Sequence, residues 1–386
     1  MIRDSYLPYG RQSIDEKDIE AVVNVLKGDY LTTGPAIQEF EIKVANYVDA
    51  KYAVAFSNGT AALHGACFAA GIGIGDEVIT TPMTFAASAN CVLYQGGTVV
   101  FADINSQTYN IDPLEIKNSI TSKTKAIIPV HFTGQPADLS AIHDLAKVHN
   151  LVVIEDAAHA IGATYNGKKI GGLSDMTMFS FHPVKHITSG EGGMITTNSK
   201  EYYEKLLQFR SHGITREAEK LIENHGPWYY EMQFLGFNYR MTDVQAALGT
   251  SQLQKLDSFI DRRKEIVSMY NEAFSDLNEI TVPYQQSDGD SSWHLYVINI
   301  DTELLAVGRK DIFEKLQKRN IGVNVHYIPV HTFPYYTDLG YQKGSLPIAE
   351  RLYENIISLP LFPAMSNKDV HDVIVAVKEV IAQVKK

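Results

Sequence analysis

Short apolar strands alternate with helical segments from residue 52 to residue 197, and this alternation restricts the fold more than any other feature of the chain. Strands are predicted at Tyr52–Phe56, Glu77–Thr80, Val99–Ala102, Ala126–Val130, Leu151–Glu155, Met176–Phe181 and Gly192–Thr197. Parallel strands need a crossover between them, usually a helix, and the helices then cover both faces of the sheet. We therefore expect an α/β fold with a mainly parallel, seven-stranded sheet flanked by helices.

The C-terminal part of the chain has a different pattern. Thr242-Asp243-Val244-Gln245 has the spacing of a capping box, which predicts a long helix that continues to about Phe274. Beyond it we predict strands at His294–Ile300 and Gly322–Ile328, and helices at Arg309–Asn320, near Ile348–Ile357 and at Asp369–Lys385. We expect a large domain over residues 1–245, which includes the N-terminal segment. The long linking helix and a small α/β domain then occupy residues 246–386.

Composition and charge limit the classes of partner. The 386 residues are 45% hydrophobic, which is enough for a large core, and the net charge of −11 argues against nucleic-acid binding. Cys67 and Cys91 lie far apart within apolar runs, so neither a disulfide framework nor a thiolate metal site is indicated. No apolar stretch has the length of a membrane span, and the first residues contain no signal-like apolar region. We expect a cytoplasmic protein that binds neither nucleic acid nor a membrane.

Lys185 lies in a polar loop between two predicted strands. The ordinary interpretation of such a residue is a solvated loop lysine. Pro183 restricts the backbone before it, however, and Gly190, Gly192 and Gly193 permit tight turns and the close approach of a flat ligand. A lysine held in this way and partly desolvated has a lowered pKa and attacks an aldehyde to form a Schiff base. The loop therefore suggests a pyridoxal phosphate site.

Pyridoxal phosphate also needs a carboxylate at its ring nitrogen and a pocket for its phosphate. Asp156 follows the strand predicted at Leu151–Glu155, at the end where open α/β sheets place ligand groups. The turn Ser57-Asn58-Gly59-Thr60 leads from a strand into the helical run Ala61–Ala70, and the N-terminus of a helix attracts phosphate. Ser180, near the end of its own strand, adds a hydroxyl. The sequence thus contains all three parts of the site.

Other kinds of site fit the sequence less well. The glycines at positions 71–75 follow a helix instead of a strand, and their spacing is not that of a dinucleotide fingerprint. The histidine pairs His182/His186 and His326/His331 raise the question of a metal, but neither pair has a carboxylate or thiol set beside it. We expect neither a dinucleotide nor a metal.

Four motifs together are recognisable: Ser57–Leu63, Glu155–Ala160, Ser180–Lys185 followed by Gly190–Gly193, and Gly236–Asp243. They resemble the DegT/DnrJ family of nucleotide-sugar aminotransferases, and the likeness runs in matching order from about residue 7 to the C-terminus. The resemblance implies the type I fold of aminotransferases that depend on pyridoxal phosphate (PLP). It also implies a homodimer whose active sites lie at the subunit interface.

The resemblance implies roles for individual residues. Lys185 matches the lysine that holds the cofactor and then acts as the catalytic base, and Asp156 matches the partner of the ring nitrogen. The other cofactor-binding positions are Thr60, Ala61 and Ser180 for the phosphate, Phe85 for stacking on the ring, His159 where many relatives carry Gln, and Asn238 for the phosphate of the neighbouring subunit's cofactor. From the residues alone, Phe85 is equally well explained as a core aromatic.

Within the family, three segments suggest the substrate. They are the His-Pro-Val-Lys loop, Arg210–Ile214 and Val325–Pro329. They resemble aminotransferases that act on UDP-4-keto-6-deoxy-N-acetylhexosamines, as in pseudaminic acid biosynthesis. This implies transfer of an amino group from glutamate to the C4 ketone of UDP-2-acetamido-2,6-dideoxy-hexos-4-ulose. The candidates for substrate contact are Arg240, His326 and Tyr327.

Three alternatives stay open. The amino acceptor could be another ketone, such as a dTDP- or GDP-linked sugar, a 3-keto sugar or a keto-inositol. A related sugar dehydratase shares the fold but lacks the Schiff-base lysine, so Lys185 counts against it. A non-catalytic regulator that binds PLP would need an output module, and the chain has no basic DNA-reading helix for one.

Overall fold

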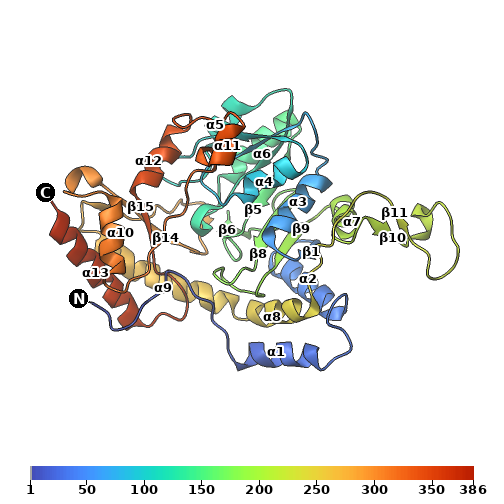
Figure 1. Cartoon of the computed structure of the whole chain (residues 1–386), viewed down its shortest axis with the longest axis horizontal. Coiled ribbons are helices and arrows are strands. Elements are labelled where there is room, and N and C mark those ends of the chain that lie inside the picture. The colour runs from blue at the N-terminus through green and yellow to red at the C-terminus, as the bar shows by residue number, and fades with distance from the viewer. Residues whose placement is uncertain (1) are drawn as a thin grey trace.

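A seven-stranded sheet lies at the centre of the computed structural model, which describes residues 2–386 (Figure 1). In spatial order its strands are β1 (Tyr52–Phe56), β9 (Gly193–Thr197), β8 (Met176–Ser180), β5 (Val152–Asp156), β4 (Thr124–Ile128), β2 (Glu77–Thr80) and β3 (Thr98–Phe101). Strand β9 is antiparallel to both neighbours, and the pairs from β8 to β3 are parallel. The predicted α/β fold with a mainly parallel sheet is confirmed.

Helices cover both faces of this sheet, which explains why the strands are apolar at consecutive positions. On β1, Val54 and Phe56 belong to a core cluster shared with α3 and α7, whereas Ala53 and Ala55 belong to a cluster shared with α2 and α8. The helices of this part of the chain are α1 (Glu16–Leu26), α2 (Pro35–Tyr47), α3 (Gly59–Ala69), α4 (Ala87–Tyr94), α5 (Pro113–Ser119), α6 (Leu139–His149), α7 (Lys200–Phe209) and α8 (Asp243–Leu253). Short 3₁₀ turns lie at Phe132–Gly134 and Ala218–Lys220.

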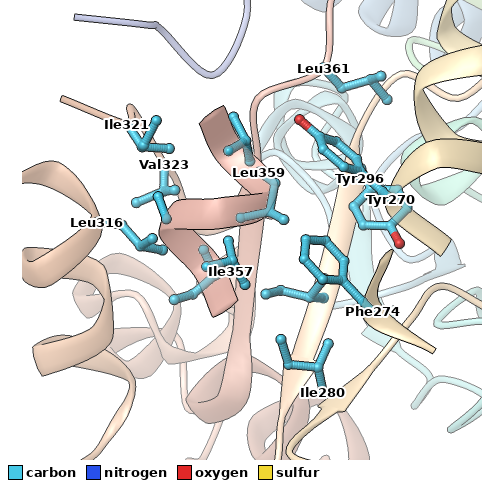
Figure 2. Packing of buried hydrophobic residues seen from close by; sticks show 14 of the residues in the cluster. Tyr270, Phe274, Ile280, Tyr296, Leu316, Ile321, Val323, Ile357, Leu359 and Leu361 are labelled. Atoms are coloured by element: carbon cyan, nitrogen blue, oxygen red, sulfur yellow. The ribbon is translucent and has the colours of Figure 1, made fainter. Parts of the chain in front are cut away.

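A second, smaller sheet lies toward the C-terminus. Its antiparallel strands follow the order β12 (Ile280–Thr281), β14 (Tyr296–Ile300) and β15 (Ile356–Leu359). Around it lie α9 (Leu256–Phe274), α10 (Arg309–Gln317), α12 (Pro347–Asn355), α13 (Asn367–Val384) and a 3₁₀ turn at Thr302–Leu304. Helix α11 (Pro334–Asp338) and the 3₁₀ turn at Val330–Thr332 instead pack, through Tyr336 and Val330, in a core cluster of the large sheet. Figure 2 shows Tyr270 and Phe274 of α9 packed against Tyr296 of β14 and Leu359 of β15. This core is separate from the clusters of the large sheet.

Two further small sheets complete the strands of the described residues. The first contains β13 (Gly289–Asp290), β6 (Thr164–Tyr165) and β7 (Lys168–Lys169). The second is a ribbon of β10 (Ile214–Thr215) and β11 (Glu231–Met232) that projects from the body at the right of Figure 1. Both chain termini lie at the opposite end, near α13.

The predicted long helix from residue 242 to about Phe274 was wrong, because two helices replace it. Helix α8 ends at Leu253 and α9 begins at Leu256, and the amides between them bond three residues back, Lys255 N to Gln252 O at 3.0 Å. At this break the Gln252 and Lys255 side chains both donate to the buried Asp18 carboxylate of α1. This contact between distant segments is not visible in the local pattern. The boundary between residues 245 and 246 remains a prediction.

The strand predicted at Gly322–Ile328 was also wrong. Only an isolated bridge joins Asn324 to Ser358, and beyond it the chain leaves the small sheet to line a cavity with His326 and Tyr327. The third strand of that sheet is β15, whose first residues were predicted as the end of a helix near Ile348–Ile357. Helix α12 instead stops at Asn355, and the β-branched, fully buried Ile356 and Ile357 continue as a strand.

Candidate active site

A cavity of about 730 Å³ lies where strands of the large sheet meet residues of the C-terminal part of the chain. This is the usual size of a site for a small organic ligand. Its wall includes most of the predicted site residues, namely Thr60, Ala61, Phe85, Asp156, His159, Ser180, Lys185, His326 and Tyr327. Segments far apart in the sequence therefore contribute to one cavity.

The N-terminus of α3 forms one end of the cavity. Asn58 caps the helix, and its side-chain oxygen accepts the Ala61 N–H at 2.8 Å. The earlier amides of Gly59 and Thr60 have no partner within a helix, and the helix dipole makes this end positive. A Cβ on Gly59 would lie 3.4 Å from the Ser180 Cβ, so β8 brings the Ser180 hydroxyl beside these amides. Together they suit a phosphate group.

Gly193, the first residue of β9, makes this close packing possible. A Cβ at this position would lie 2.4 Å from the Asn58 carbonyl oxygen and 2.7 Å from the Gly59 nitrogen, both of them backbone atoms. Any larger residue would push β9 away from the turn that begins α3. The glycines after the lysine loop therefore serve the helix N-terminus as well as the loop itself.

Asp156 ends β5 and is buried in the wall of the cavity. Its carboxylate accepts the Ser88 hydroxyl at 2.6 Å and the Ala158 N–H at 3.1 Å. Burial raises the pKa of the Asp156 carboxyl, whereas the Ser88 and Ala158 hydrogen bonds and the charge of Lys185 lower it. A cationic ring nitrogen placed beside it would favour the ionised carboxylate further.

Lys185 is half-buried at the cavity wall, in a loop that is held by hydrogen bonds between its own residues. The Lys185 N–H donates to the His182 carbonyl at 2.9 Å, and the Thr188 hydroxyl donates to the Phe181 carbonyl at 3.0 Å. Burial lowers the pKa of the Lys185 ammonium from 10.5 to about 8, although the charge of Asp156 opposes this shift. This environment differs from that of a solvated loop lysine, and it favours a reactive amine.

Imidazole and phenol groups also line the cavity, from His159, His294, His326 and Tyr327. The Tyr327 hydroxyl and His159 Nε2 are 3.0 Å apart, and the two rings stack. His326 Nδ1 lies 2.7 Å from the Ser358 hydroxyl. Burial lowers the pKa of His159, and it lowers that of His326 to about 3, so both imidazoles are neutral near pH 7. The wall offers neutral hydrogen-bonding groups to a bound molecule.

Two predicted residues stand apart from this cavity. Asn238 is exposed and forms an isolated backbone bridge with Ser211, and Arg240 is half-buried. Within residues 2–386, neither is among the residues that line the cavity. Both belong to the segment that follows the projecting β10–β11 ribbon.

Sequence reasoning missed several residues of the cavity wall, including Tyr9, Thr84, Glu191 and His294, and it missed Ser88 behind Asp156. The one available signal was the pair of hydroxyl residues Thr84 and Ser88 on either side of Phe85.

No group of three or more histidine, cysteine, aspartate or glutamate residues is arranged to hold a metal among residues 2–386. Over the same range, no helix has both the length and the apolar character needed to cross a membrane.

The donor set of the cavity fits PLP. A lysine amine with a lowered pKa would hold the aldehyde carbon, and the buried Asp156 carboxylate would meet the ring nitrogen. The α3 N-terminus, with Thr60 and Ser180, would take the phosphate. Phe85 is 63% exposed within this open wall, which leaves its ring free to stack on a flat ligand.

The chain is similar to known proteins over nearly its whole length. A family model described as the DegT/DnrJ/EryC1/StrS aminotransferase family matches residues 12–378. An uncharacterized protein of Methanocaldococcus jannaschii is 46% identical over 99% of this chain and 100% of its own length. The spore coat polysaccharide biosynthesis protein SpsC of Bacillus subtilis is 43% identical over 98% of both chains.

Solved structures with the same fold include two that bear on the site. One is Helicobacter pylori PseC, an aminotransferase involved in the biosynthesis of pseudoaminic acid. It has a TM-score of 0.91 and 33% identity, over 98% of this chain and 100% of PseC. Another is Spr1654 from Streptococcus pneumoniae in its PLP form, with a TM-score of 0.90 and 32% identity, over 98% of this chain and 99% of that one.

Proposed function

The chain belongs to the DegT/DnrJ/EryC1/StrS aminotransferase family, and on this premise we propose that it aminates the C4 ketone of a UDP-linked 4-keto-6-deoxy sugar. The protein is a PLP-dependent sugar aminotransferase, as its family and structural neighbours are. The proposed acceptor is UDP-2-acetamido-2,6-dideoxy-hexos-4-ulose, and the proposed amino donor is glutamate. The product would be a UDP-4-amino sugar for a surface glycan of the pseudaminic acid type.

One observation carries the proposal: Lys185, Asp156 and the N-terminus of α3 line the same cavity. An amine with a lowered pKa, a buried carboxylate and an anion site are the three groups that PLP needs. The choice of sugar is supported by the likeness to PseC and to SpsC, which is a spore coat polysaccharide biosynthesis protein.

Asp156 and Lys185 have separate roles in the proposed reaction. When bound, PLP carries the amino group between the two substrates and accepts electron density as a C–H bond breaks. Asp156 orients the ring nitrogen and keeps it protonated, because a carboxylate beside it favours the cationic form. Lys185, as general base, would take the proton from the α-carbon of glutamate and, as general acid, deliver it to C4′ of the cofactor. Its pKa of about 8 lies close enough to neutral pH for both roles.

The part of the cavity lined by His326 and Tyr327 is assigned to the sugar. His326 and Tyr327 face the cavity as neutral donors or acceptors, which suits hydroxyl and acetamido groups of a sugar better than a carboxylate. Burial raises the pKa of Tyr327, so its hydroxyl stays protonated and can donate a hydrogen bond. Arg240 lies outside this cavity and is kept as a candidate for the charged part of the nucleotide.

The site is proposed to be completed by a second copy of the chain. Asn238 lies on the surface outside its own cavity, as expected of a residue that reaches the cofactor phosphate of a neighbouring subunit. The proposal therefore includes a homodimer with shared active sites. We also propose that the enzyme works in the cytoplasm.

A two-stage spectroscopic experiment tests the function. Purified protein supplied with PLP should show the visible absorption band of the lysine-bound cofactor, and glutamate alone should convert it to the pyridoxamine form. Adding the UDP-4-keto sugar should then restore the band. A panel of dTDP- and GDP-linked 4-keto sugars, a 3-keto sugar and a keto-inositol distinguishes the acceptor. Failure of the first band refutes the whole proposal, and restoration only by another ketone refutes the proposed acceptor.

A further inference from the structure

Two hydroxyl groups form a chain that ends on the Asp156 carboxylate. Thr84 Oγ1 and Ser88 Oγ are 2.7 Å apart, and Ser88 Oγ lies 2.6 Å from Asp156 Oδ2. Exposed fractions are 3% for Thr84, 0% for Ser88 and 5% for Asp156, so water does not compete freely for these groups. Thr84 lines the cavity itself, whereas Ser88 lies behind Asp156 in the first turn of α4.

The hydrogen bonds from Thr84 to Ser88 and on to Asp156 have a defined donor direction. A carboxylate has no proton to give, so the single Ser88 proton is donated to Asp156. The Phe85 carbonyl is a second possible acceptor for this proton, but it lies 3.4 Å away, against 2.6 Å for the carboxylate. With its proton used, Ser88 Oγ accepts the proton of Thr84 Oγ1. Thr84 therefore donates to Ser88, and Ser88 donates to Asp156.

We propose that Ser88 and Thr84 are positioning residues of the reaction, which hold Asp156 ionised and oriented toward the ring nitrogen of the cofactor. The Ser88 hydroxyl occupies one carboxylate oxygen, and the Ala158 N–H occupies the other at 3.1 Å. Both are donors, and donors favour the ionised form of a buried carboxyl group. The carboxylate keeps unused lone pairs for the ring N–H. This inference rests on the proposed function.

The hydroxyl chain of Thr84 and Ser88 also links two contacts of the cofactor. Thr84 immediately precedes Phe85, the residue assigned to stacking on the ring, and Ser88 lies in the first turn of the helix that follows. The same short segment thus positions the face of the ring and, through Asp156, its nitrogen. A hydroxyl at 84 is needed because an apolar side chain there would leave Ser88 with an unsatisfied acceptor.

Other charged and titratable groups surround Asp156 and would also affect its state. They are Lys185 on the lysine loop, His131 beside β4, Cys91 on α4 and Tyr327 from the C-terminal part of the chain. None of them is altered by changes at Thr84 or Ser88. A change in ring protonation in those variants therefore reports on the hydroxyl chain.

Three variants and one control test the inference. Ser88→Ala removes the donor to Asp156, Thr84→Val removes the donor to Ser88 with little change in shape, and Thr84→Ser restores that donor. The control is Thr196→Val, which removes another fully buried hydroxyl whose hydrogen bond, to the Gly171 carbonyl, is also 2.6 Å long. Each full-length protein is loaded with PLP whose ring nitrogen is isotope-labelled.

The readouts are the NMR shift of the ring nitrogen and the pH profile of the visible band, with kcat/KM alongside. In Ser88→Ala the ring nitrogen should lose its proton at lower pH than in wild type, and kcat/KM should fall roughly 10- to 100-fold, as for loss of one hydrogen bond to a charged group. In Thr84→Val the loss of the ring-nitrogen proton and the fall in kcat/KM should go in the same direction as in Ser88→Ala, but by less. Thr84→Ser and Thr196→Val should match wild type.

The outcomes separate this inference from the proposed function. If wild type and Thr196→Val form no visible band with PLP, the proposed function fails and this inference fails with it. If both form the band and Ser88→Ala keeps the wild-type ring-nitrogen shift across the pH range, only the hydroxyl chain is refuted. Should Ser88→Ala not fold, an unchanged shift in Thr84→Val overturns the inference, and a shift that Thr84→Ser reverses supports it.

Discussion

The lowered pKa of Lys185 predicts how fast the protein takes up its cofactor at neutral pH. Only the unprotonated amine attacks the aldehyde of PLP. With a pKa of about 8 instead of 10.5, about one molecule in ten has a free amine at pH 7, against about one in three thousand for an ordinary lysine. The structure thus predicts a gain of roughly 300-fold in reactive amine.

The substitution Asp156→Asn tests how burial and the charge of Asp156 together set the pKa of Lys185. The charge of Asp156 favours the ammonium form of Lys185, and burial opposes that form. Removing the charge while keeping the shape should therefore lower the pKa of Lys185 below its wild-type value. A larger share of the protein should carry a free amine at pH 7, even though turnover is lost.

The assay is the rate at which cofactor-free protein binds PLP between pH 6 and pH 10, followed by the visible band. In wild type the rate should rise with pH and level off near pH 8. In Asp156→Asn it should level off at lower pH. Lys205→Met, which changes a partly exposed lysine of α7 that pairs with Glu201, is the control and should match wild type.

Two results would refute the reasoning. A wild-type rate that still rises tenfold per pH unit at pH 9 means that burial does not lower the pKa of Lys185. A plateau that moves to higher pH in Asp156→Asn means that the carboxylate does not act on this amine.

Three further predictions concern the remaining parts of the site. Asp156→Ala should nearly abolish turnover and leave the circular dichroism spectrum unchanged, and substantial retained activity would exclude Asp156 as the partner of the ring nitrogen. Gly193→Ala should lower the free energy of unfolding by roughly 1 to 3 kcal/mol in denaturant titrations and weaken PLP binding, because its Cβ would lie 2.4 Å from the Asn58 carbonyl oxygen. Mixing inactive Lys185→Ala and Asn238→Ala subunits should restore up to about a quarter of wild-type activity if Asn238 serves the neighbouring site, and no recovery would place its role within one subunit.

Local patterns in the sequence predicted the large sheet well. Each of its strands is a short apolar run bounded by turn residues, and both of its faces are covered, so the pattern is strong and continuous. Asp156 directly follows a predicted strand and Thr60 precedes a predicted helix, whereas Lys185 lies in the loop between two predicted strands, where Pro183 and the glycines indicated its role. Placing them in one cavity required no more than the rule that strand ends of a parallel sheet lie at one edge.

Long-range contacts account for the errors. The break between α8 and α9 lies where Gln252 and Lys255 meet Asp18, more than two hundred residues earlier in the chain. The segment after Asn324 has an acceptable strand composition but leaves the small sheet to line the cavity. In both places a tertiary contact outweighs the local preference, as expected when propensities differ by less than about 1 kcal/mol per residue.

The sequence by itself determined the strands of the large sheet, the chemistry of the lysine loop and the identity of the groups a cofactor would need. These depend on the period of apolar residues and on short motifs, both of which are local. Only the tertiary structure decided which groups modify those residues: burial at the cavity wall lowers the pKa of Lys185, and the Ser88 hydroxyl from α4 holds Asp156. Desolvation and hydrogen bonding depend on the distance between atoms in space, and residues 68 positions apart in the chain come within 2.6 Å only after folding.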